Sequence, residues 1–140
     1  MPCLSGRFDP KIGPLLNLGV APAGAIAAAA QRGTHLQAFP ALLDTGASST
    51  CISPTIAQVL QLHARGKAQM SSATHVTAHV NVYLVDLFLP FGTSGWLVDN
   101  RQVLEFAPPA NSPFQALLGR DVLCSGILTM SFDGHFTFSL

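Results

Sequence analysis

Short apolar runs separated by turn residues alternate along most of the chain. Six of them have the length and composition of a β-strand, namely residues 14–20, 34–44, 81–90, 96–98, 102–106 and 114–119. Residues 127–140 predict a further hairpin, because Asp133 and Gly134 form a strong turn signal between two alternating runs. Many short strands with this spacing predict an all-β, closed barrel-like domain.

Two segments depart from the strand pattern and predict one or two short helices. Ser53 offers an N-cap hydroxyl in front of Pro54, and apolar residues follow at helical spacing to about Leu62. A second helix of one or two turns is predicted over residues 120–126, which end on a glycine. Residues 66–80 are small, polar and alternating, as in a solvent-exposed hairpin.

Composition limits the domain count and the kinds of partner. With 140 residues the chain is long enough for one domain, which we assign to residues 14–140 after a loose N-terminal arm at residues 1–13. Only 10% of the residues are charged, against about 25% in an average domain, so a partner is expected to cover part of the surface. The net charge is zero, and neither nucleic acid nor a membrane is an expected partner.

Three cysteines, Cys3, Cys51 and Cys124, lie far apart without the spacing of a zinc site or a disulfide framework. We therefore expect no metal and no cofactor, and three reduced thiols in a cytoplasmic protein, two of them in the core. A signal peptide at residues 15–30 is the minority alternative, because Pro22 and two glycines interrupt this apolar stretch.

Asp44 ends an apolar strand and precedes a series of small, mostly hydroxylated residues. A helix cap is the usual role of such an aspartate, but the next predicted helix has its own cap in Ser53. A metal site requires histidine or cysteine ligands at a suitable spacing, whereas the neighbours of Asp44 carry hydroxyls. A serine triad requires a nucleophile on a sharp elbow such as G-x-S-x-G, which the sequence lacks. A pair of carboxylates that shares one proton remains, and such a pair can activate water for amide hydrolysis.

Residues 42–48 (LLDTGAS) resemble the active-site loop of the retropepsin-like aspartic proteases. A second motif of this family, an apolar pair followed by Gly-Arg-Asp, stands at residues 117–121 (LLGRD). The order of the predicted elements matches the family from about residue 14 to residue 140. The resemblance implies a retropepsin fold and an aspartic endopeptidase that acts on peptide or protein, and it favours a cellular or bacterial member.

The resemblance also implies roles for individual residues. The catalytic loop consists of Asp44, Thr45 and Gly46, with Thr45 bonded to its twin across a dimer. Residues 70–75 would form the tip of a flap that closes over the substrate. The substrate-binding residues would be Ala47 and Ser48 in the loop and, in the flap tip, Ser71, Ser72, Ala73 and Thr74. The active site would be supported from below by Leu117, Leu118, Gly119, Arg120 and Asp121.

The count of motifs implies a homodimer, because the chain contains one D-T-G and the dyad needs two aspartates. The terminal residues 128–132 and 136–140 would pair in the dimer sheet, with Phe132, Phe136 and Phe138 at the interface. Two positions differ from the viral enzymes. Ser48 replaces an acid, so that Arg120 needs another partner (Asp121, Asp9 or the C-terminal carboxylate), and the flap lacks paired glycines.

Other residues and functions remain as alternatives. Asp86 is expected to point outward from its strand, and His75 and His79 are expected to be exposed hairpin residues rather than metal ligands. A catalytically silent retropepsin-fold module for dimerisation or peptide binding is the alternative function. A small barrel that binds an apolar ligand, with a purely structural Asp44, is a third and weaker possibility.

Overall fold

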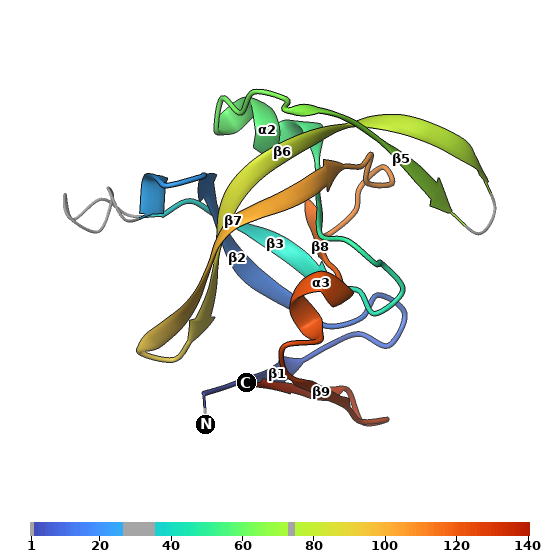
Figure 1. Cartoon of the computed structure of the whole chain (residues 1–140). Helices are drawn as coiled ribbons and strands as arrows, with labels where there is room; N and C mark the ends of the chain where they lie inside the picture. Colours follow the sequence, from blue (N-terminus) through green and yellow to red (C-terminus); the bar gives the residue numbers. More distant parts are fainter. Residues whose placement is uncertain (1, 27–35, 73–74) are drawn as a thin grey trace.

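The computed structural model describes residues 2–26, 36–72 and 75–140 of the chain (Figure 1). In these ranges it contains the short helices α2 and α3 and ten strands. The elements are β1 (Cys3–Arg7), β2 (Leu15–Pro22), β3 (Ala38–Leu43), β4 (Cys51–Ile52), α2 (Pro54–Val59), β5 (Gly66–Ser72), β6 (His75–Phe91), β7 (Ser94–Glu105), β8 (Ala116–Leu118), α3 (Arg120–Leu123), β9 (Ile127–Met130) and β10 (His135–Ser139).

Six strands form a closed barrel in the order β2-β3-β8-β4-β7-β6, and β6 pairs back onto β2. The first half of β6 pairs with β5 and its second half pairs with β2, so that the β5–β6 hairpin extends away from the barrel (Figure 1). The predicted all-β, barrel-like class with short helices is therefore confirmed. The predicted connection at residues 21–33 lies mostly outside the described residues.

A second sheet of three strands, in the order β1-β10-β9, contains both ends of the chain. The termini lie close together, where the Leu140 N–H donates to the Pro2 carbonyl at 3.1 Å (Figure 1). The expected loose arm is wrong for β1, because its residues pair with β10 from Cys3 to Arg7. The hairpin around Asp133 and Gly134 is confirmed, whereas the division into residues 1–13 and 14–140 stays a prediction.

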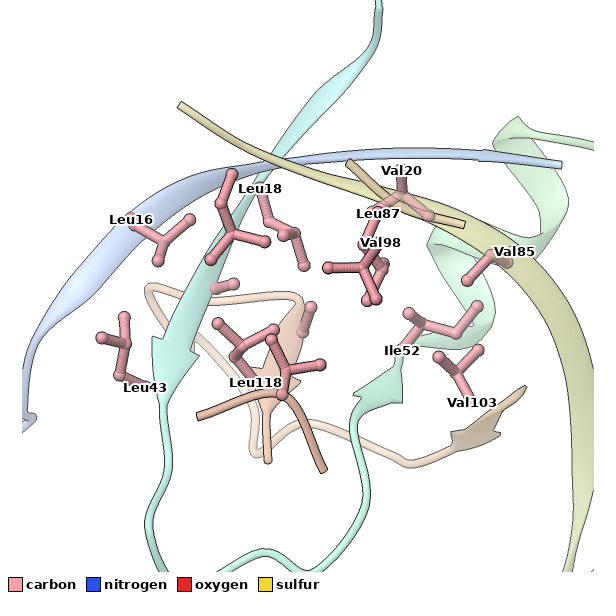
Figure 2. Packing of buried hydrophobic residues seen from close by; sticks show 14 of the residues in the cluster. Leu16, Leu18, Val20, Leu43, Ile52, Val85, Leu87, Val98, Val103 and Leu118 are labelled. Carbon is pink, nitrogen blue, oxygen red and sulfur yellow. The ribbon is translucent and has the colours of Figure 1, made fainter. Parts of the chain in front are cut away.

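The barrel interior is filled by aliphatic side chains that point toward one another from all sides (Figure 2). Leu18, Ile52, Val103 and Leu118 are fully buried, and each such side chain contributes about 1.5–3 kcal/mol to folding. The alternation of apolar and polar positions in the sequence is the cause, since successive strand residues face opposite sides of a sheet.

The three phenylalanines of the terminal hairpin, all predicted at an interface, differ in their exposure. Phe136 and Phe138 are buried in the core of their own chain, so their predicted place at an interface is wrong. Both edges of β10 are also occupied, by β1 and β9, and its backbone has no free edge for a second copy. Phe132, by contrast, is fully exposed.

Asp86 lies beside a β-bulge between β6 and β7, and it is buried although it alternates with the core residues Val85 and Leu87. The extra residue of the bulge belongs to β7, since Val85 pairs with Arg101 and Leu87 pairs with Val98, and only 2% of Asp86 is exposed. Its carboxylate accepts the N–H of Gly24 at 2.8 Å and that of Asn100 at 2.9 Å. The two strands predicted at residues 96–98 and 102–106 belong to the single strand β7 and lie before and after this bulge.

The helix start at Ser53 is confirmed, because its hydroxyl accepts the N–H of Ile56 and Pro54 occupies the first helical position. The helix predicted after residue 119 is also present, as α3. The expectation of two core cysteines is wrong, since only Cys51 is buried while Cys3 and Cys124 are exposed.

Candidate active site

Asp44 follows the last residue of β3 and lies half-buried at the start of a tight loop. Its main-chain N–H donates to the Leu118 carbonyl at 3.0 Å, which fixes the backbone at this point. Its Oδ1 accepts the N–H of Gly46, two residues on, at 2.9 Å, which is the hydrogen bond of an Asx turn. A Cβ at position 46 would lie 3.1 Å from the same oxygen, so the glycine allows a close approach. The loop therefore orients the carboxylate through its own backbone.

The LLGRD stretch, which was predicted to support the active site, lies beside the Asp loop in the strand order. β8 lies between β3, which enters the Asp loop, and β4, which leaves it. Leu118 pairs in parallel with Leu43, and Leu117 pairs in antiparallel fashion with Cys51. A Cβ at Gly119 would lie 2.6 Å from the Ser49 carbonyl carbon, so only glycine fits where this strand passes the loop.

Arg120 binds the Asp loop directly, with a partner that the sequence did not suggest. Its Nη1 donates to the Thr45 carbonyl at 2.7 Å, and its main-chain N–H donates to the Ala47 carbonyl at 2.8 Å. The prediction that a carboxylate is the partner of Arg120 is therefore wrong. A main-chain acceptor explains how the arginine keeps its place although position 48 is a serine and not an acid.

Thr50 and Asp121 form a second link, and the role of Thr50 was missed at the sequence level. Thr50 is fully buried, and its hydroxyl donates to Asp121 Oδ1 at 2.8 Å and accepts the Gly119 N–H at 3.1 Å. The bonds join the end of the loop to β8 and the first turn of α3. One more threonine in a series of hydroxylated residues carries no sequence signal for this contact.

A cleft of about 810 Å³ lies between the Asp loop and the β5–β6 hairpin. Its lining includes Asp44, Gly46, Ala47, Ser48 and Ser71. Five of the predicted catalytic and substrate-binding residues thus line one hollow, whereas Thr45 lies exposed outside this lining.

The remaining predicted site residues belong to the tip of the β5–β6 hairpin and to the LLGRD stretch. Ala73 and Thr74 lie outside the described residues, as does the side chain of Ser72. Leu117 joins the cleft lining, and Leu118 is buried behind it. Met70 and Val80, on the two strands of the hairpin, also line the cleft.

Cys51 lines the cleft but has the properties of a core thiol. Burial, followed by the negative charges of Asp121 and Asp44, raises the pKa of Cys51 to about 12. The thiol is therefore neutral at physiological pH and is not a nucleophile for this cleft.

Tyr83, Asn81 and Glu105 form a polar cluster beside the cleft. The Tyr83 hydroxyl donates to Glu105 Oε1 at 2.8 Å, and Asn81 Nδ2 donates to Glu105 Oε2 at 3.5 Å. Burial, and then the bond to Glu105, raises the pKa of Tyr83 above its usual value. In the described part of the chain, no group of three His, Cys, Asp or Glu side chains is placed to hold a metal ion.

Comparison with known proteins identifies the family and supports the fold. The family model described as aspartyl protease matches residues 31–122. The chain therefore belongs to the aspartyl protease family. No curated protein matches the sequence significantly. Within the described ranges, none of the helices is both long and apolar enough to cross a bilayer.

Solved structures confirm the predicted retropepsin-like fold, and 17 chains match. A retropepsin-like aspartic protease from Rickettsia conorii matches with a TM-score of 0.60 and 12% identity, over 97% of this chain and 89% of that chain. The EIAV protease in complex with the inhibitor HBY-793 matches with a TM-score of 0.47 and 16% identity, over 86% of this chain and 93% of that one. The second likeness is too weak to support the fold assignment.

Proposed function

We propose that this protein is an aspartic endopeptidase, whose active site consists of the Asp44 carboxylates of two chains in a homodimer. The observation that carries the proposal is the placement of Asp44. Its carboxylate is held by the Gly46 N–H and lines a cleft between the loop and a hairpin. An extended peptide would bind in this cleft by adding strand-like contacts.

The dyad needs two chains, because only one D-T-G occurs in 140 residues. Two carboxylates a few ångströms apart cannot both be ionised, so they share one proton. The ionised carboxylate takes a proton from water, and the protonated one donates to the carbonyl oxygen of the scissile amide. No cofactor takes part in these steps.

The edge of the second sheet is a candidate dimer surface. In the described residues β9 pairs only with β10, so its other edge is free for a second copy. Ile127 is 65% exposed and Phe132 is 101% exposed, and Met130 adds a third apolar side chain. Apolar side chains beside a free edge favour an interface between copies, in agreement with the predicted role of residues 128–132.

The other predicted roles are part of the same proposal. Thr45 is exposed, which leaves its hydroxyl free to bond to the twin loop. Ala47, Ser48 and the hairpin tip from Ser71 to Thr74 would contact the peptide, and closure of the tip would exclude water.

Substitution of the aspartate tests the proposal. Asp44→Asn is expected to abolish cleavage of denatured protein while the circular dichroism spectrum and the sedimentation coefficient stay unchanged. Asp99→Asn removes an exposed acid from β7 outside the cleft and is expected to keep full activity. Cleavage that persists in Asp44→Asn would refute the proposal. A wild-type chain that binds peptides but cleaves none would be the silent module instead.

A further inference from the structure

A second, smaller hollow adjoins the active-site cleft. It encloses about 270 Å³, and its lining includes Ala57, Leu62 and Tyr83. Pro54 and Glu105 belong to the walls of both the small hollow and the cleft. A substrate side chain that leaves the cleft beside these two residues would enter the small hollow, which we call the side pocket.

The carboxylate of Glu105 is held in a fixed position at the junction. The Tyr83 hydroxyl donates to Oε1 at 2.8 Å, and Asn81 lies within 3.5 Å of Oε2. Tyr83 is only 5% exposed, so the ring that anchors the carboxylate is itself locked in the core. Each carboxylate oxygen has lone pairs for more than one donor, so both can accept further hydrogen bonds.

Charge in the two hollows is of one sign. Among the described residues that line them, the acids are Asp44 and Glu105, and there is no lysine or arginine. His63, which also lines the side pocket, is exposed. The described lining of the two hollows therefore offers no lysine or arginine to neutralise Glu105.

The rest of the side pocket suits the stem of a long basic side chain. Ala57, Leu62 and the ring of Tyr83 offer apolar surface, and Gln58 and Gln61 add neutral polar groups. Lysine and arginine bury their methylene stems against such surface while their charged ends reach a carboxylate.

We propose that the side pocket binds a lysine or arginine side chain of the peptide substrate and that Glu105 is the specificity-determining residue. The proposal rests on the proposed peptidase function of the cleft. A norleucine in this place would fill the apolar part but leave the carboxylate without its cation. A glutamate would be repelled, so the pocket selects against acids as well as for bases.

A peptide panel tests the proposal with the full chain. Peptides that differ at a single position, as Lys, Arg, norleucine or Glu, are scanned along the substrate, and kcat/KM is measured for each. At one position Lys or Arg is expected to exceed norleucine by about tenfold, the range of a charge-assisted bond. Equal rates for Lys and norleucine at every position would overturn the proposal, whatever the stability of any variant.

Variants then assign the preference to Glu105. Glu105→Gln keeps the shape and an acceptor for Tyr83, and it is expected to reduce the Lys/norleucine ratio to about threefold or less. Glu105→Lys is expected to reverse the preference toward the Glu peptide. Asp99→Asn removes an acid from the same strand but from neither hollow, and its ratio is expected to equal that of the wild type. An unchanged ratio in Glu105→Gln would refute the role of Glu105.

Binding separates this proposal from the peptidase proposal. Fluorescence anisotropy with the Asp44→Asn chain measures Kd for the Lys and norleucine peptides without cleavage. Tighter binding of the Lys peptide, by about tenfold, supports the side pocket even if the wild-type chain cleaves nothing, and then only the peptidase proposal fails. Equal Kd values, together with normal cleavage by the wild type, overturn the side pocket alone.

Discussion

The link between Thr50, Asp121 and Gly119 predicts a large effect from an isosteric substitution. Thr50→Val keeps the shape of a fully buried side chain but removes both bonds of its hydroxyl, at 2.8 Å and 3.1 Å. A bond to a carboxylate contributes about 1.5–3 kcal/mol and a neutral bond about 0.5–1.5 kcal/mol. We therefore expect the free energy of unfolding to fall by about 2–4.5 kcal/mol.

The assay is urea denaturation followed by the fluorescence of Trp96, the single tryptophan, at one fixed protein concentration. Thr50→Ser is the matched control, because it keeps the hydroxyl and loses one methyl group, at a cost of about 1 kcal/mol. If Thr50→Val unfolds within about 0.5 kcal/mol of the wild type, or if Thr50→Ser costs as much, the hydroxyl does not hold the loop.

Three further predictions concern groups whose environment the structure defines. Cys51 is expected to resist iodoacetamide near neutral pH while the two exposed cysteines react, because its pKa is raised to about 12; equal labelling in peptide mass spectrometry would contradict this. Tyr83, the single tyrosine, is expected to titrate above about pH 10 by ultraviolet absorbance, and Glu105→Gln is expected to lower its midpoint only in part, since burial is the larger cause. A midpoint at the ordinary value would refute this. Asp86→Ala is expected to lower the free energy of unfolding in urea by about 3 kcal/mol or more, because two backbone N–H groups lose a buried acceptor. A loss below about 1 kcal/mol would show that these bonds contribute little.

The barrel and the Asp loop were predictable because their signals are local. A period-2 alternation, a proline after a capping serine and an Asp-Gly turn each act within a few residues. The two motifs at residues 42–48 and 117–121 are far apart in sequence, but their resemblance to one family predicted that they meet. In the structure they do, since β8 lies between β3 and β4.

The errors have a common physical cause, because they concern contacts made across the fold. Asp86 follows the alternation of its strand, but it is buried where backbone N–H groups 62 and 14 residues away donate to its carboxylate. β1 looks irregular by itself and becomes a strand only beside β10 at the other end of the chain. A carboxylate was predicted as the partner of Arg120 because charged side chains can be identified in a sequence. Its partner in the structure is a backbone carbonyl, which a sequence does not single out.

The most direct test of the central claim is to mix wild-type chains with Asp44→Asn chains. If one active site requires an aspartate from each of two chains, a mixed dimer has a single carboxylate and cannot supply both the base and the acid. Addition of an equal amount of Asp44→Asn, followed by exchange of subunits, is then expected to reduce the activity of a fixed amount of wild type to about half. Activity that stays unchanged after exchange has been verified by mass-labelled chains would contradict a site shared between two copies of this protein.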